Sequence, residues 1–203
     1  MTGIRLLAVH GLVVKKAGGA TAVADLLGRD EAAVLLALDA AEAEGHVMAG
    51  KGTYIATPAG RAWLDAEYPN AFANWRASGE AAAAYEAFEK VNRSLLTVFT
   101  DWQMMPVGAG RVANDHSDAE YDNEVIDRFG AQHERAQRPL GMFEQLDGRM
   151  GEYTRRLDAA YERVLAGDYQ FMSGVGVGSY HTVWFELHED LLRMLGRERE
   201  EPS

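Results

Sequence analysis

The chain has 203 residues, no cysteine, and 31 acidic against 20 basic side chains, which gives a formal net charge of -11. The lack of cysteine excludes disulfides, thiolate chemistry and cysteine-based zinc sites, and the negative charge opposes non-specific attraction to nucleic acid or anionic membranes. With 47% hydrophobic and 25% charged residues, the composition is typical of a globular protein with one large domain or two small ones.

The apolar stretch IRLLAVHGLVVKK near the start is not expected to be a signal peptide. Its lysines follow the apolar run, and no small-residue cleavage site comes after it. No apolar run approaches the roughly 20 residues that span a bilayer. We therefore expect no membrane segment, and the lack of cysteine favours the reducing cytoplasm as the compartment.

The first third of the chain predicts three short helices followed by a β-hairpin. Residues 4–16 form the first helix, AGGA ends it, and Thr21 can cap the second helix. Asp30 caps the third helix, EAAVLLALDAAEAEG, which Gly45 ends. HVMAGKGTYIATPAGR then has the pattern of a strand, a glycine-rich turn and a second strand, and Pro58 begins one more helix.

This order of three helices, EGHV, a GKG turn and YIATPAGRAWL resembles the winged-helix domain of MarR- and PadR-type transcription regulators. The resemblance covers about residues 4–68. It implies an N-terminal winged helix-turn-helix whose third helix enters the major groove of DNA.

The third predicted helix has few side chains that read base edges. Recognition needs Arg, Lys, Asn, Gln, Ser or Thr on the exposed face, whereas the positions aligned to face DNA carry alanine and leucine. Residues 1–68 hold six basic and eight acidic side chains, a net charge of -2, which is unfavourable for neutralising phosphates. The residues predicted to contact DNA or a partner are Arg29, Leu35, Leu36, Lys51 and Arg61.

Two interpretations of this domain therefore stay open. In the first, it binds DNA, with phosphate contacts from Arg29, Lys51 in the wing and Arg61. In the second, Leu35 and Leu36 form a protein interface, because an exposed leucine pair on an otherwise polar helix marks a contact surface.

Residues 69–203 predict a helical bundle, so the expected fold is mainly α with a small β wing, a winged-helix domain at 1–68 followed by the bundle. The segment 80–102 has large apolar residues in a 3–4 repeat, interrupted by Asn92, a polar position of the kind that fixes register or partner. This stripe or the winged helix is expected to supply the contact of a homodimer. The stripe consists of Tyr85, Phe88, Leu95, Phe99 and Trp102.

Three further segments complete the predicted bundle. QMMPVGAGRVANDHS predicts a loop, and Ser117 with Glu120 forms a capping box for the helix that follows. Another helix covers about residues 151–165. After the glycine-rich GDYQFMSGVGVGS, the stretch SYHTVWFELHEDLLRML forms the last helix.

Chemically active side chains concentrate in three stretches of the second half: TDWQMM, NDHSDAEYD and SYHTVWFELHED. Because helix ends can meet in a bundle, we expect these stretches to enclose a polar and aromatic pocket for a small molecule. The predicted ligand-binding residues are Asp101, Trp102, Gln103, Asn114, Asp115, His116, Asp118, Tyr121, Ser179, His181, Trp184 and His188.

These residues do not form a recognisable metal or nucleophile motif. His181 and His188 are seven residues apart, about 10.5 Å along a helix, and no HExxH motif is present, so no metal and no cofactor is expected. A His–Asp pair is the minimum for general base catalysis. The alternative is that the histidines are structural, each with a buried hydrogen-bond partner. The catalytic candidates are His181, His116 and Asp118.

The glycines of GVGVGS precede a helix N-terminus, where exposed backbone amides can bind an anion. A dinucleotide fingerprint would need a preceding strand and different glycine spacing, so a connector is the favoured interpretation. An anion bound there would lie beside Ser179 and His181.

The second half also resembles bacterial regulator-type proteins that share DWQ, NDHSD and YHTVWFELHEDLL-like segments, over most of residues 85–196. Some proteins of that kind accompany phosphoenolpyruvate-utilising phosphotransferase components. The leading hypothesis is a ligand-responsive, dimeric transcription regulator of the MarR/PadR type that binds a small molecule in its second half. One alternative is an accessory subunit whose winged helix docks an enzyme such as a phosphotransferase-type partner, and another is a His/Asp-dependent enzyme.

Overall fold

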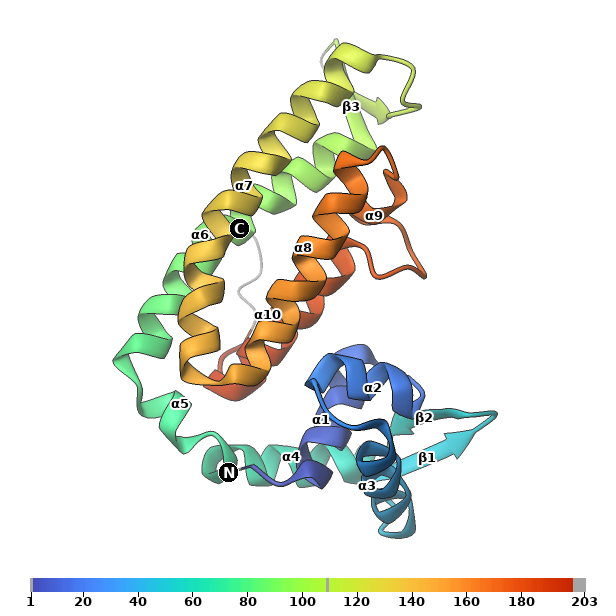
Figure 1. Ribbon diagram of the computed structural model, residues 1–203, viewed down its shortest axis with the longest axis vertical. Helices are drawn as coiled ribbons and strands as arrows, with labels where there is room; N and C mark the ends of the chain where they lie inside the picture. Colours follow the sequence, from blue (N-terminus) through green and yellow to red (C-terminus); the bar gives the residue numbers. More distant parts are fainter. Residues whose placement is uncertain (1, 109, 199–203) are drawn as a thin grey trace. The chain divides into compact units, whose positions relative to one another are not determined.

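The computed structural model describes residues 2–108 and 110–198 and is mainly helical, with two small two-stranded sheets (Figure 1). The described chain forms two compact units. The first consists of residues 2–79 and 185–198, and the second of residues 80–184. Within this part of the chain, no helix combines the length and the apolar character that crossing a membrane requires.

The division expected after residue 68 differs from this one. Helix α4 (Pro58–Ala71) continues past residue 68 and includes Pro69. A proline inside a helix removes one backbone hydrogen bond, but here the helix does not end at it. The C-terminal segment also returns to the first unit, which helical periodicity cannot reveal. Residues 199–203 of the predicted bundle at 69–203 lie outside the described residues.

In the first unit, three helices enclose an apolar core and a hairpin follows them, as the sequence predicts. Leu12, Leu26 and Leu38 are fully buried in this core. The elements are α1 (Ile4–Lys15), α2 (Ala20–Leu27), α3 (Glu31–Ala43), β1 (Val47–Gly50), β2 (Thr53–Ala56), α4, α5 (Ala73–Ala77) and the C-terminal part of α10 (Tyr180–Leu195). Gly18 forms an isolated antiparallel bridge with Tyr54 of β2, so the segment between α1 and α2 pairs with the hairpin.

Side-chain caps explain where two of these helices begin. Asp30 caps α3 as expected, and Thr57 caps α4 by accepting a hydrogen bond from the Gly60 N–H at 3.0 Å. Thr21 was expected to cap α2, but it lies inside the first turn of that helix, and its hydroxyl donates to Glu31 at 2.8 Å.

The second unit consists of long helices and a second hairpin. Helices α6 and α8 begin and end within about one residue of the predicted positions. The elements are α6 (Gly79–Gln103), β3 (Met104–Val107), β4 (Gly110–Ala113), α7 (Ala119–Leu146), a 3-10 turn at Gly148–Met150, α8 (Gly151–Leu165), α9 (Gln170–Ser173) and the N-terminal part of α10.

The loop predicted between α6 and α7 contains the β3–β4 hairpin instead. Met104 pairs with Ala113 and Met105 with Val112 in antiparallel register. The sequence favoured a loop because each strand has only four residues and β3 contains Pro106, a residue found mainly on edge strands. The cap of α7 also differs: Asp118, not Ser117, accepts the first backbone N–H groups of the helix.

The apolar stripe of α6 is buried inside the second unit. Phe88 stacks on Trp184 with ring centroids 4.6 Å apart, and the indole Nε1–H of Trp184 donates to Asn92 Oδ1 at 3.0 Å. Asn92 therefore receives a hydrogen bond from this chain's own last helix. Because the stripe packs the core of its own unit, it is not exposed as a dimer surface, and the expected homodimer stays a prediction that depends on other surfaces.

Candidate functional site

A polar cluster lies where α6, the β3–β4 hairpin and the start of α7 meet. We call this group the hairpin cluster; it consists of Asp101, Trp102, Arg111, Asn114, His116, Tyr121, Asp122 and Arg128. At one side, the carboxylate of Asp101 accepts Arg128 at 2.7 Å and Arg111 at 2.9 Å. The hydroxyl of Tyr121 donates to the Asp101 carbonyl at 2.8 Å, which fixes α7 against the end of α6.

The other side of the hairpin cluster is a group of three side chains that bind one another: Asn114, His116 and Asp122. The amide of Asn114 donates to Asp122 at 2.8 Å and to the Trp102 carbonyl at 3.1 Å. His116 Nδ1 lies 3.0 Å from Asp122 Oδ2, and its ring lies 4.3 Å from the Trp102 ring. His116 has a backbone φ of +59, a strained value for a residue other than glycine. The contacts to Asp122 and Trp102 stabilise His116 in this conformation.

The sequence left the carboxylate partner of His116 open, and the structure supplies one. The nearby Asp118 caps α7, while the partner of His116 is Asp122. The carboxylate of Asp115 accepts hydrogen bonds from Ser117, which lower its pKa. The hydrogen bonds of Asp115, Asp118 and Asp122 order the turn before α7. The polar groups of the hairpin cluster therefore bind one another and are not directed into a cavity.

The structure brings eight of the twelve predicted ligand residues to this end of the second unit. The exposed Gln103 takes part through its backbone carbonyl, which accepts Asn114 N–H at 2.9 Å. The eight residues are Asp101, Trp102, Gln103, Asn114, Asp115, His116, Asp118 and Tyr121.

The four predicted residues on or before α10 have other surroundings. Ser179 accepts a hydrogen bond from Thr182 N–H at 3.3 Å and so caps α10. His181 packs edge-on against Phe99 at 4.8 Å, and burial lowers the pKa of its imidazole. Trp184 stacks in the aromatic core, and His188 is buried in the first unit. The carboxylates of Asp101 and Asp118, two of the predicted site residues, bind arginines and backbone amides instead of His181.

A cavity of about 440 Å³ lies elsewhere in the second unit, along α8. Phe171 of α9 and Gly178, just before α10, also line it; Figure 1 shows α8, α9 and α10. Three arginines face this space, and none of the twelve predicted ligand residues lines it. Its lining consists of Arg155, Arg156, Ala159, Ala160, Glu162, Arg163, Phe171 and Gly178.

The first unit exposes apolar side chains on α3, its third helix. Leu35 is 41% exposed and Leu36 is 71% exposed. Asp39, one turn along α3 from Leu35, accepts the hydroxyl of Tyr54 at 2.9 Å and thereby ties the helix to β2. Arg29, Lys51 and Arg61 are also exposed.

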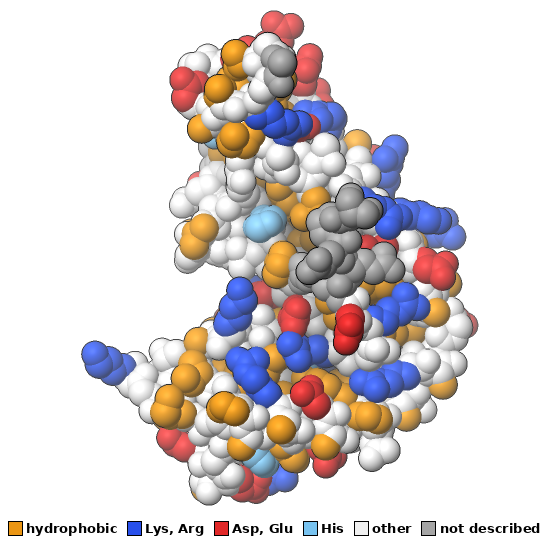
Figure 2. Space-filling model, turned by 180° about the vertical axis from the view of Figure 1, so that it is seen from behind, with side chains coloured by type: hydrophobic (Ala, Val, Ile, Leu, Met, Phe, Trp, Pro, Cys, Tyr) orange, Lys and Arg blue, Asp and Glu red, His pale blue; other side chains and the backbone are white. Residues whose placement is uncertain are grey.

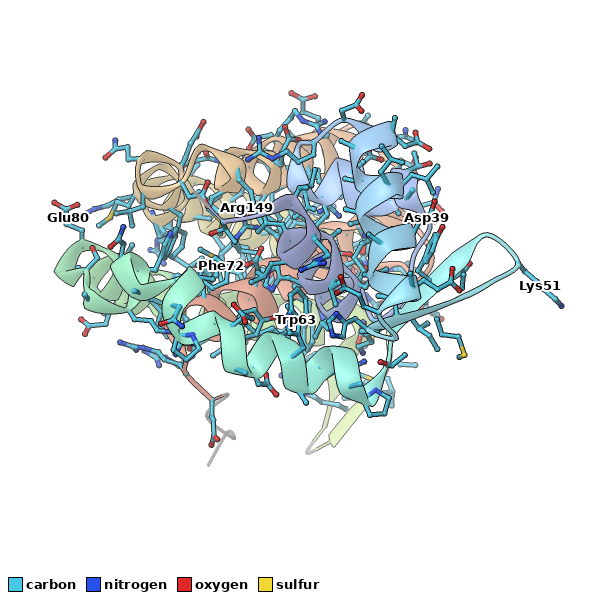
Figure 3. All side chains as sticks on the ribbon, turned by 90° about the horizontal axis from the view of Figure 1, so that it is seen from below. Asp39, Lys51, Trp63, Phe72, Glu80 and Arg149 are labelled. Atoms are coloured by element: carbon cyan, nitrogen blue, oxygen red, sulfur yellow. The ribbon has the colours of Figure 1, made fainter. Side chains whose placement is uncertain are left out.

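The β1–β2 hairpin carries a second exposed apolar pair. Met48 and Ile55 lie opposite one another in the register and are 56% and 38% exposed. They alternate with Tyr54, so they occupy the other face of the hairpin from the tyrosine. Lys51 is at the hairpin tip and points away from the unit (Figure 3), and Figure 2 shows hydrophobic side chains between that tip and the body.

No family model, curated protein or solved structure matches this chain. In the described residues, no group of three or more histidine, aspartate or glutamate side chains is arranged to hold a metal ion.

Sequence reasoning missed a buried polar network in the first unit. The imidazole of His10 lies 2.9 Å from the Tyr68 hydroxyl through Nδ1 and 2.8 Å from the Asp190 carboxylate through Nε2. His10 and Asp190 are 0% exposed, and burial raises the pKa of Tyr68. The sequence does place one histidine in the apolar run of α1, which indicates a buried partner but not its identity.

Proposed function

We propose that this protein is a regulator whose first unit is a winged helix that binds a partner protein through α3. The order of three helices, a hairpin and a further helix supports the winged-helix assignment, together with the bridge between Gly18 and Tyr54. The exposure of Leu35 and Leu36 on the third helix is the observation that carries the partner assignment.

The chemistry of this helix favours protein over DNA. Burial of a leucine side chain in an interface contributes about 1.5–3 kcal/mol, whereas leucine cannot form hydrogen bonds with base edges. Glu31, Asp39 and Glu42 are exposed on the same helix and would repel phosphates. The partner that fits this face has an apolar depression flanked by lysine or arginine side chains. Two copies of α3 would bring like charges together, so a different protein fits better than a second copy.

DNA binding is the second candidate function. The cations Arg29, Lys51 and Arg61 support it, because all three are exposed and Lys51 is at the hairpin tip, where winged helices contact the phosphate backbone. In that case affinity would depend strongly on salt and weakly on base sequence.

Photocrosslinking from α3 tests the proposal in the cells from which the protein comes. A benzoylphenylalanine at position 36 is expected to give a discrete adduct with one protein, while the same group at Thr97, which is exposed on the second unit, does not. The crosslinked protein is then purified and titrated with the full chain.

The double variant Leu35→Asp with Leu36→Asp is expected to weaken that binding by roughly tenfold or more, about 1.4 kcal/mol. Its matched control is Lys51→Glu with Arg61→Glu, which should leave the protein complex intact. Crosslinks to DNA instead of protein, or a shift of DNA fragments at low salt that the Lys51 and Arg61 changes abolish, would establish the second candidate and reject the first.

A further inference from the structure

We infer that the cavity along α8 is a binding site for an amphipathic organic anion, a molecule with an apolar body and a carboxylate or phosphate group. The cavity belongs wholly to the second unit and its volume of about 440 Å³ suits a small metabolite. Three arginines line it against one glutamate, Glu162. The lining itself thus offers more cationic than anionic side chains, although Glu152 and Asp168 pair with two of the arginines from outside it.

Two of these arginines are held in place by carboxylates outside the lining. Arg155 donates through Nε and Nη2 to Glu152 at 2.8 and 2.5 Å. Arg163 donates in the same way to Asp168, with the Nε bond at 3.1 Å. Each pair uses two of the five N–H groups of the guanidinium, and neither Nη1 has a hydrogen bond among the described residues. The carboxylates thus orient the arginines and leave donors for a ligand.

The spacing of these arginines defines the shape of the ligand. Arg155 and Arg163 are eight residues apart on α8, which is about 12 Å along the helix axis. Ala159 lies midway between them and lines the cavity with a single methyl group, so an apolar body can lie flat there. An anionic group can then meet a guanidinium at either end.

Two lining residues outside α8 add an aromatic ring and exposed backbone. The guanidinium of Arg163 lies 4.3 Å from the centre of the Phe171 ring, within the range of a cation–π contact. Gly178 lines the cavity two residues before α10, so the backbone reaches the space without a side chain. Planar guanidinium, aromatic ring and backbone together favour a flat ligand over a compact inorganic ion.

The fluorescent aromatic sulfonate 8-anilinonaphthalene-1-sulfonate is a suitable probe for the full chain. We expect saturable binding of one equivalent with a rise in fluorescence. The double variant Arg155→Gln with Arg163→Gln should weaken it by roughly tenfold or more. The matched control is Arg135→Gln with Arg138→Gln, two exposed arginines of α7 that should leave the affinity unchanged.

Two further measurements separate charge from shape. The uncharged N-phenyl-1-naphthylamine should bind the arginine variant and the parent chain equally, and Ala159→Trp, which fills the cavity, should abolish binding of both dyes. Benzoate and phenyl phosphate compete in separate titrations, and displacement by one or both identifies the preferred anion. The inference is overturned if the arginine variant, with an unchanged circular dichroism spectrum, binds the sulfonate as tightly as the parent chain, or if neither anion displaces it.

This site does not depend on the proposed partner protein. The dye titration uses the isolated chain, so it can fail while crosslinking from position 36 succeeds, and the reverse. If both succeed, crosslinking yield in the presence of the displacing anion would measure whether the ligand regulates the partner contact.

Discussion

His10 Nε2 lies 2.8 Å from Asp190 Oδ1, although 180 residues separate the two in the chain, and both side chains are completely buried. The hydroxyl of Tyr68 occupies the other imidazole nitrogen. The contact joins α1 to the C-terminal part of α10 within the first unit. This contact is one reason why the C-terminal part of α10 is part of the first unit.

We predict that breaking this pair destabilises the protein strongly. Asp190→Ala or His10→Ala removes one member and leaves the other buried, which costs about 3–5 kcal/mol in the free energy of unfolding. Urea denaturation followed by circular dichroism measures the loss. The control Glu44→Gln removes an exposed carboxylate that pairs with Arg5, and should cost less than about 1 kcal/mol.

A double variant distinguishes a coupled pair from two independent sites. His10→Leu with Asp190→Leu replaces both buried polar groups with apolar ones and should be less destabilising than the single variants His10→Leu and Asp190→Leu added together. Strict additivity would mean that the pair contributes nothing beyond the packing of its members.

A second prediction concerns the stability at acid pH. Burial lowers the pKa of both His181 and His133 below the ordinary value of 6.5. Between the lowered values and 6.5, these two imidazoles bind more protons in the unfolded chain than in the folded chain, so their contribution to stability falls as the pH drops below 6.5. Replacing His181 with Gln removes one of these titrations, and the variant should lose less stability than the parent chain between pH 7.5 and 5.5.

The measurement is the urea midpoint at both pH values, compared between the parent chain and each variant. His133→Gln should act in the same direction, since the same cause lowers its pKa. An equal or larger loss in both variants would show that these imidazoles are protonated in the folded state.

Local sequence patterns predicted the helices whose ends are set by neighbouring residues. Asp30 before an alanine-rich run gave the start of α3, and Gly45 at φ +76 gave its end. The 3–4 repeat gave α6, and its polar interruption at Asn92 indicated a specific partner. The partner itself, Trp184, comes 92 residues later, and periodicity shows only which face of a helix is buried, not what covers it.

The candidate site could be predicted only in part, for the same reason. The residues of TDWQ and NDHSD do meet, because a short hairpin connects the two helix ends. Which carboxylate binds His116 depends on a turn with positive φ that the sequence did not indicate. The cavity along α8 was missed because its arginines are spread over two turns of helix and resemble an ordinary exposed face.

A third prediction tests the TPAGR segment with a pair of glycine substitutions. A methyl group at Gly60 would lie 2.0 Å from the backbone oxygen of His46, which cannot move aside easily. Gly60→Ala should therefore cost about 3 kcal/mol or more. Gly141, inside α7, has open space at the same position, so Gly141→Ala should stabilise the protein by about 0.5–1 kcal/mol. Thermal unfolding measures the change in melting temperature of each variant, expected to fall for Gly60→Ala and to rise for Gly141→Ala. Equal changes in the two variants would contradict the packing described at Gly60.

A fourth prediction concerns the hydrogen bond between Trp184 and Asn92 in the core of the second unit. Asn92→Ala leaves the indole N–H buried without its acceptor, which costs about 1–3 kcal/mol beyond the lost packing. In Trp184→Phe the donor is gone, so a subsequent Asn92→Ala should cost less than it does in the parent chain. The difference between these costs, measured by urea denaturation, is the coupling energy, expected near 1 kcal/mol. A coupling indistinguishable from zero would mean that Asn92 does not hold α10 against α6 through this bond.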